Sequence, residues 1–457
     1  MRVQCRLLDH TIGDDGRIGA VELVGDADPV IAKLASGPTT VLLEPVGADV
    51  RVEAVARGVI TDERGVSQLL IGDDPNAAAP VADTQAAGSV PWAKAVAVLL
   101  GVWAIVAAAT SGLRPYWYDE SWSLAFARLP FTDWAPLIRF GEINMVGYHT
   151  VLKGWTALVG TDEWVGRLPS VAAGVVAGVA LYAVAARAWN QRIAFGAVVL
   201  FATSASMLDY AQQARAYSAA TAATTLSMWV LLRWRDHPRV ATLALWSVAA
   251  GIAATLHVFA AFCIAGQLLG AFAAGRRRFS LLVAGAAAAV LVAPVGYYLA
   301  FGTGGGTQVD WIPDPTWRTA LDVAELVTGG RGLLAAAAVA ALAGAGLRRN
   351  RAAAADVPTD RFARWAFAGW VAVPVSAALV MSAIGQPLVV ARYFLPMLPA
   401  IAILAAAGAR RSFGDLWAGP IAVLALVGVL YQAELLASRP TWDGRAAAET
   451  VAAQVQT

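Results

Sequence analysis

Charged residues are scarce in this chain. Asp, Glu, Lys and Arg make up 14% of the 457 residues, and 58% are hydrophobic. Because a soluble domain carries about 25% charged residues, this composition indicates a polytopic membrane protein. The net charge of +2 points to no particular partner, and no nucleic-acid partner is expected. The Ala- and Arg-rich composition is typical of a high-GC bacterium, so we expect a location in the bacterial plasma membrane.

Cysteine is equally rare. Cys5 and Cys263 lie in different regions, which excludes a disulfide framework and a Cys-rich metal site. The first residues, Met-Arg-Val-Gln-Cys-Arg, lack the apolar segment of a cleavable signal peptide. We therefore expect the first spanning helix to serve as the insertion signal. Tryptophan is plentiful instead, with 17 residues that mostly end apolar runs, as interfacial anchors do.

The N-terminal 90 residues differ from the rest. They are acid-rich, are interrupted by Gly and Pro, and contain β-prone runs at Thr40–Leu43, Val50–Val55 and Val66–Ile71. The pattern predicts a small β-containing cytoplasmic domain of unknown role over 1–75, followed by a linker over 76–91. A disordered segment and an unusually upstream start site are the alternatives. No catalytic motif occurs in this region.

Long apolar runs fill the remainder. They predict an all-α integral membrane domain over 92–437 with about eleven transmembrane helices, followed by an external tail over 438–457. The eleven runs are 92–111, 164–187, 192–209, 214–234, 240–257, 258–275, 279–301, 331–347, 364–384, 392–409 and 416–437.

Basic residues set the predicted topology. Under the positive-inside rule, five Arg clusters mark cytoplasmic loops. These clusters are Arg187/Arg192, Arg233/Arg235/Arg239, Arg276/Arg277/Arg278, Arg348/Arg349/Arg351 and Arg410/Arg411. The loops alternate only if the short apolar segment 144–160 does not cross the bilayer. We therefore expect amphipathic helices within a long first external loop, a cytoplasmic N-terminus and an external C-terminus.

Two adjacent carboxylates, Asp119 and Glu120, follow the first apolar run among aromatic rings. Ionisable groups near a membrane are costly and are often functional. One carboxylate could act as a base while the other orients an acceptor or binds a cation. A solvated loop pair is the alternative.

Two arginines on the predicted outer face are candidate phosphate ligands. Arg392, with Tyr393 beside it, suits bidentate phosphate capture, and a snorkelling side chain is the alternative. Arg215 opens a helix, where the helix dipole favours anions, so it suits a carboxylate or a phosphate partner. A structural pair with Asp209 or with the first loop is the alternative for Arg215.

Further polar and aromatic side chains share the predicted outer face. The acceptor- or substrate-binding candidates among them are Tyr118, Glu142, His149, Gln213, Tyr217, His257 and Trp311. The two histidines could also hold a divalent metal with Glu120 or Glu142, although a lone His is more often a packing residue. The Gly-rich run 302–306 before Asp310-Trp311 suggests a mobile lid, with a flexible connector as the alternative.

Four motifs carry a family resemblance: Tyr118-Asp119-Glu120, Arg167–Ser170, the segment 210–217, and Arg392-Tyr-Phe-Leu-Pro396. Over about 92–410 the chain resembles the GT-C superfamily of polytopic glycosyltransferases. The nearest branch looks like the protein O-mannosyltransferases and aminoarabinose transferases, including bacterial mannosyltransferase-like members. The resemblance implies a polyprenyl-phosphate-linked sugar donor and a lipid, glycan or protein acceptor at the outer face. It also implies that Asp119 is the base and that Arg392 and Arg215 hold the donor phosphate.

The sequence therefore predicts a membrane glycosyltransferase that moves a hexosyl or pentosyl group, with Asp119 as general base and Glu120 as its helper. One alternative is a lipid or polysaccharide transporter or flippase, which would need polar residues along a path through the membrane. Here the polar clusters gather on one predicted face. The other alternative is a non-catalytic membrane scaffold.

Overall fold

The computed structural model describes the strands within 2–71 and residues 92–275, 277–301, 311–330, 332–347 and 361–438. Several predictions fall outside the described residues: the linker 76–91, the lid at 302–306 with Asp310, and the tail beyond Ser438. The chain forms two compact units, Met1–Val90 and Pro91–Thr457.

The N-terminal unit contains five strands in a closed barrel of order β1-β2-β5-β4-β3. Strands β1 and β3 pair in parallel, and the other neighbours pair antiparallel. Closure gives each strand two partners, which leaves no open sheet edge. Three strands overlap the β-prone runs of the sequence. The strands are β1 (Arg2–Arg6), β2 (Ala20–Leu23), β3 (Thr39–Pro45), β4 (Val52–Thr61) and β5 (Ser67–Ile71).

The second unit is a helical bundle, and each of the eleven apolar runs falls on helices there. The first elements are α2 (Trp92–Ser111), α3 (Tyr118–Arg128), α4 (Phe131–Gly141), η1 (Ile143–Met145), α5 (Val146–Val159), α6 (Glu163–Ala188), α7 (Gln191–Ala202), α8 (Ala205–Ala211), α9 (Tyr217–Asp236) and α10 (Val240–Leu256). The others are α11 (Ala260–Ala273), α12 (Arg278–Phe301), α13 (Trp317–Thr328), α14 (Leu333–Leu347), α15 (Arg361–Ala383), η2 (Ala391–Met397), α16 (Leu398–Phe413), η3 (Gly414–Trp417) and α17 (Ala418–Ala437).

Fewer than eleven of the described helices are long and apolar enough to count as membrane spans. In the described part of the chain, five helical stretches are long and apolar enough, or up to seven if the bent pairs α7–α8 and α13–α14 each count once. Helices α10 and α11 are apolar but only 17 and 14 residues long. The chain is a multi-pass membrane protein, and the number of eleven spans stays a prediction.

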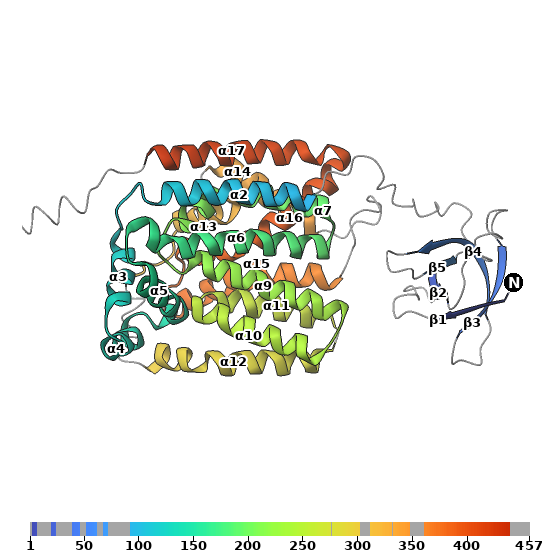
Figure 1. The fold of residues 1–457 in the computed structure, drawn as a ribbon, viewed down its shortest axis with the longest axis horizontal. Helices are drawn as coiled ribbons and strands as arrows, with labels where there is room; N and C mark the ends of the chain where they lie inside the picture. The colour runs from blue at the N-terminus through green and yellow to red at the C-terminus, as the bar shows by residue number, and fades with distance from the viewer. Residues whose placement is uncertain are drawn as a thin grey trace, which may run out of the picture. The chain divides into compact units, whose positions relative to one another are not determined.

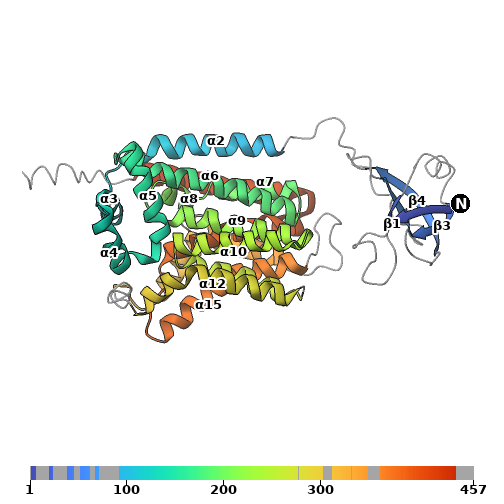
Figure 2. The ribbon, with the colours of Figure 1, turned by 60° about the horizontal axis from the view of Figure 1, so that its bottom comes forward.

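Long helices lie side by side along the bundle, whereas α3, α4 and α5 gather at one of its ends (Figures 1 and 2). Helix α5 has 14 residues, about 21 Å of helix, which is short of the ~30 Å hydrocarbon core. This length agrees with the expectation that 144–160 does not cross the bilayer. The first loop thus forms a helical layer over the bundle end.

Glycines allow the tightest helix contacts in the bundle. A Cβ atom on Gly266 of α11 would collide with the carbonyl oxygen of Gly369 on α15, and one on Gly408 of α16 would collide with that of Leu342 on α14. Small residues at such crossings let helix backbones approach closely, which is how membrane helices gain packing contacts.

The apolar run 192–209 breaks into α7 and α8, which meet at 63°. Ser204 caps α8 by accepting the Met207 N–H at 3.1 Å. Gln432 of α17 donates to the carbonyls of Ala202 and Ser204 at 2.9 and 3.1 Å. These side chains satisfy backbone groups that a break would otherwise leave unpaired. The break turns α8 and its Asp209 toward the first loop.

Candidate active site

Asp119 and Glu120 lie in the first turn of α3, where the helix dipole favours negative charge. The Trp117 N–H donates to Glu120 Oε2 at 3.3 Å, so the Glu120 side chain folds back over the helix start. This arrangement sends the two neighbouring carboxylates in different directions. Glu120 is fully buried, whereas the Asp119 side chain is 21% exposed.

Glu120 forms a bidentate pair with Arg167 of α6. The Arg167 Nε and Nη2 atoms donate to its two oxygens at 2.7 Å each, and the Ala214 N–H donates at 2.7 Å. Arg167 is also fully buried and donates to the carbonyls of Ser111, Arg114 and Pro115. The pair therefore joins the end of α2, the start of α3, α6 and the α8–α9 connection. Such contacts are those of a positioning residue, and the catalytic role predicted for Glu120 as the helper of Asp119 stays a prediction.

Asp119 faces Arg392. The Asp119 Oδ2 and Arg392 Nη2 atoms are 3.7 Å apart, close enough for ionic attraction but longer than a hydrogen bond. The guanidinium carbon lies 6.0, 5.2 and 5.9 Å from the ring centres of Trp117, Trp311 and Tyr393. Three of the predicted outer-face elements, far apart in sequence, thus meet around one cation.

Arg215 holds the main chain of α3. Its Nη1 atom donates to Ser123 Oγ at 2.9 Å and to the Asp119 carbonyl at 3.2 Å, and its Nη2 atom lies 4.0 Å from Glu142 Oε2. These contacts match the structural alternative considered for Arg215, a pair with the first loop. The phosphate-binding role predicted for it stays a prediction.

Glu142 and His149 form a partly buried pair beside Arg215, with the His149 Nε2 and Glu142 Oε2 atoms 3.4 Å apart. Burial lowers the pKa of His149 by disfavouring its charged form, against the opposing effect of Glu142. The pKa of Glu142 is also below its usual value. Burial acts to raise it, but the His149 hydrogen bond and the Arg215 charge outweigh burial. The pair is therefore a neutral imidazole beside a carboxylate at neutral pH.

This pair predicts a pH dependence of stability. Below about pH 6.5, an unfolded His binds a proton that buried His149 resists, so the free energy of unfolding falls as the pH falls. We expect His149→Gln, whose amide can still donate to Glu142, to flatten the decline in Tm between pH 7 and pH 5. Scanning fluorimetry in detergent measures this, with exposed His237→Gln as the matched control. An unchanged slope in His149→Gln would contradict the assignment.

A row of four contacting rings, the aromatic cluster, is formed by Tyr210, Tyr217, His257 and Tyr393. The centroid distances are 5.2 Å for Tyr210–Tyr217, 5.5 Å for Tyr217–His257 and 4.9 Å for His257–Tyr393. The Phe259 N–H donates to His257 Nδ1 at 3.2 Å, which assigns the proton of the neutral ring to Nε2. The aromatic cluster brings predicted residues from three segments together. Among the described residues, no group of three or more His, Cys, Asp or Glu side chains is arranged to hold a metal ion.

Two of the predicted binding residues point elsewhere. The Tyr118 side chain is 71% exposed and packs edge-on against Trp122. Gln213 is buried, and its Nε2 atom donates to Asp209 Oδ2 at 3.1 Å. Asp209 in turn pairs with Arg114 at 3.2 Å. Gln213 therefore supports a neighbouring polar cluster at the α8 end.

Comparison with known proteins gives a family match over part of the chain and structural matches to the bundle. Residues 146–298 match the family model of dolichyl-phosphate-mannose-protein mannosyltransferases. The bundle also matches the crystal structure of ArnT from Cupriavidus metallidurans in the apo state, with a TM-score of 0.51 and 17% identity over 73% of this chain and 63% of that one. The same protein bound to undecaprenyl phosphate matches with a TM-score of 0.52 and 15% identity, over 74% and 64%.

The helical bundle has the fold of ArnT, and about a third of the chain matches the mannosyltransferase family. The resemblance inferred from its four motifs is confirmed. At these identities the structural matches establish the fold alone, and this chain spans less than two thirds of the length of ArnT. No curated protein sequence matches it.

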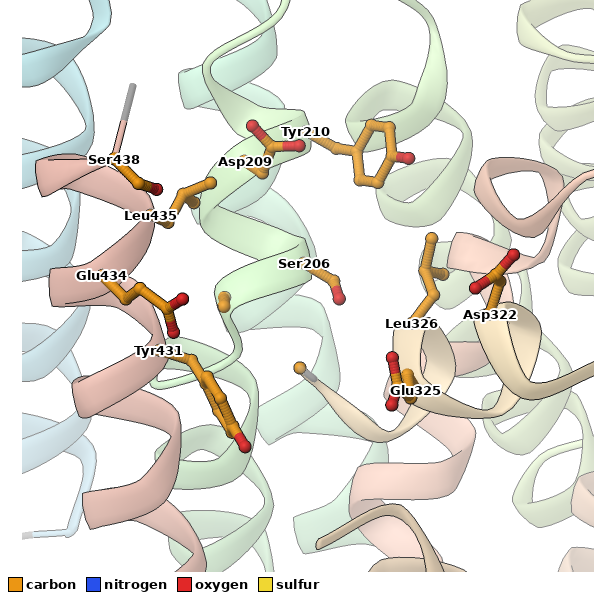
Figure 3. Close-up of a pocket in the computed structure, with 12 residues that line it drawn as sticks. Ser206, Asp209, Tyr210, Asp322, Glu325, Leu326, Tyr431, Glu434, Leu435 and Ser438 are labelled. Atoms are coloured by element: carbon orange, nitrogen blue, oxygen red, sulfur yellow. The ribbon is translucent and has the colours of Figure 1, made fainter. Parts of the chain in front are cut away.

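An acidic cavity of about 220 Å³ adjoins the candidate active site. Figure 3 shows carboxylates around it from three elements: Asp209 of α8, Asp322 and Glu325 of α13, and Glu434 of α17. Tyr210 lines the cavity and contacts Tyr217, so it connects the cavity to the aromatic cluster. These carboxylates disfavour an anion in the cavity.

Sequence reasoning did not single out Asp322, Glu325 and Glu434. The available signal was Glu434 itself, an ionisable residue inside the apolar run 416–437. The i, i+3 spacing of Asp322 and Glu325 also places both on one face of a helix. What the sequence does not contain is the packing of α13 and α17 around α8.

Proposed function

We propose that this chain is a GT-C membrane glycosyltransferase that moves a sugar from a polyprenyl-phosphate donor to an acceptor hydroxyl at the outer membrane face. The observation that carries the proposal is the 3.7 Å approach of the Asp119 carboxylate to the Arg392 guanidinium. A base and a phosphate ligand side by side are the two groups that this transfer requires. The partial match to mannosyltransferases supports the reaction class.

The reaction proceeds with inversion at the anomeric carbon. The acceptor hydroxyl gives its proton to Asp119, and its oxygen forms a bond to the anomeric carbon. The bond between that carbon and the phosphate oxygen breaks, and its electron pair leaves with the phosphate. Arg392 stabilises the charge that develops on the departing phosphate. Atoms and charges balance without a nucleotide or a redox partner.

Arg392 is suited to this role because its contacts leave donors free for a phosphate. Cation–π contact with three rings holds the guanidinium without consuming its N–H groups. A phosphate can accept two parallel N–H bonds from it, which the Asp119 carboxylate at 3.7 Å does not. Donor binding thus replaces Asp119 as the partner of Arg392 and releases the carboxylate for the acceptor proton.

The surroundings support the same division of roles. Arg215 donates a hydrogen bond to the Asp119 carbonyl, and the ion pair between Glu120 and Arg167 fixes the adjacent residue. Glu142, which is 23% exposed, offers an acceptor for a sugar hydroxyl beside Arg215, and the buried His149 holds it there. The acidic cavity repels phosphate, which directs the donor phosphate toward Arg392. ArnT binds undecaprenyl phosphate, which supports a lipid phosphate as the carrier.

Replacing Arg392 tests the donor site. We expect Arg392→Gln to lower kcat/KM for the donor by roughly 10- to 150-fold, the loss of a hydrogen-bonded charge contact, and Arg392→Lys to recover part of it. The measurement is transfer of labelled sugar in proteoliposomes supplied with a panel of polyprenyl-phosphate hexoses and pentoses.

Exposed Arg318→Gln on α13 is the matched control and should retain wild-type transfer. Wild-type kcat/KM in Arg392→Gln would remove the assigned phosphate ligand. Lipid translocation by the wild type with no transfer from any donor in the panel would favour a flippase instead.

A further inference from the structure

A separate apolar cavity lies at the other end of the bundle. It has a volume of about 300 Å³ and is formed by the end of α9, the start of α10 and the start of α12. Arg139 of α4 lies 4.3 Å from the Tyr298 ring, which ties the far end of α12 to the first-loop helices. The start of α12 is therefore about 30 Å from them, at 1.5 Å per residue. This cavity is remote from Asp119 and is independent of the proposed function.

The wall of this cavity is almost entirely apolar, with Trp234, Leu243 and Val283 among its residues. Its volume is at the lower end of the range that small-molecule sites occupy. An apolar wall suits a hydrocarbon chain, because burying apolar surface is favourable. A soluble anion would gain nothing from such contacts.

Two arginines, Arg239 and Arg277, are the charged residues that line the cavity. Both are exposed, and neither guanidinium has a hydrogen bond or an ion pair within the described ranges. Arg239 is the N-cap of α10, and Arg277 directly precedes α12. Cations at helix N-termini oppose the helix dipole, and an anion between them would relieve that repulsion.

We propose that this cavity binds an anionic phospholipid. An acyl chain lies against the wall formed by α10 and α12, and the headgroup phosphate lies between Arg239 and Arg277. Charge complementarity selects an anionic headgroup, because a zwitterionic lipid adds a choline cation beside two guanidinium groups that its single phosphate only partly neutralises. Five Arg clusters predict that this end is cytoplasmic, so the lipid belongs to the inner leaflet.

The test measures lipid binding by the full chain. Native mass spectrometry follows the purified protein during titration with phosphatidylglycerol, phosphatidylcholine or inorganic phosphate. We expect phosphatidylglycerol to bind most tightly to the wild type, and its Kd to rise roughly 30-fold in the double variant Arg239→Gln/Arg277→Gln, since each arginine contributes about a factor of five.

Two further variants separate charge from cavity. Arg233→Gln/Arg361→Gln removes the same net charge elsewhere and should keep the wild-type Kd. Val283→Trp keeps both arginines and fills the cavity from a partly exposed position, and it should weaken phosphatidylglycerol binding. Equal Kd values in the wild type and in both cavity variants would overturn the proposal. So would phosphatidylcholine or inorganic phosphate that binds as tightly as phosphatidylglycerol.

Discussion

We expect Asp119→Asn to reduce sugar transfer by about 10²- to 10⁴-fold, the contribution that a positioned general base makes to a rate. Asn keeps the size of the side chain and leaves the Asp119 carbonyl free to accept from Arg215 and Ser123. The fold should therefore persist while the hydroxyl proton loses its acceptor. The loss is expected in kcat, because the carboxylate acts on the acceptor during the chemical step.

The assay is the same proteoliposome transfer reaction, run with an unchanged Tm as proof of folding. Asp133→Asn on the neighbouring helix α4 is the matched control, since Asp133 is an exposed first-turn carboxylate outside the site. Transfer at the wild-type rate by Asp119→Asn would end the assignment of Asp119 as the base. It would also remove the reason for placing the reaction beside Arg392.

Arg167→Met destabilises the protein by about 3–5 kcal/mol, because it leaves the Glu120 carboxylate buried without its charged partner. Three loop carbonyls also lose their donor. The double variant Glu120→Leu/Arg167→Met removes both charges, and its stability should return to within a few kcal/mol of the wild type.

Thermal unfolding followed by Trp fluorescence in detergent measures both variants. A double variant no more stable than Arg167→Met alone would show that the lost carbonyl contacts, and not the unpaired carboxylate, dominate the loss. The double variant also reports on positioning. We expect its kcat to fall although it retains Asp119, since the segment that aims Asp119 at Arg392 is no longer held.

The helices of the bundle follow from composition. Each apolar run falls on helices because long apolar segments in a membrane protein must satisfy their backbone hydrogen bonds internally. The break at Ser204 was not predicted, because the run 192–209 has the length of a single span and contains no Pro, although Thr203, Ser204 and Ser206 interrupt its apolar residues. It depends on Gln432, more than two hundred residues later, which supplies the missing donors.

The residues of the site could be predicted from the sequence, but which of them contact one another could not. Outer-face placement grouped Asp119, Arg215 and Arg392 because charge patterning reports the side of the membrane. The charge pattern could not show which of the two adjacent carboxylates remains partly exposed. Asp119 and Glu120 look equivalent in sequence, and only the position of Arg167 on α6 shows that Glu120 is the enclosed member.

The Glu120 contacts also constrain how the protein is made. Residues 118–128 leave the ribosome early, but the partners of Glu120 are Arg167 and the backbone of Ala214. Until α6 is inserted and the chain has been synthesised past α8, the first turn of α3 lacks the Arg167 and Ala214 contacts that fix its final position. Nascent chains that stop before this point should expose the first loop to proteases, and longer ones should protect it. Arg392 is made later still, so the intermediates that precede it contain an ordered Asp119 without its cationic neighbour.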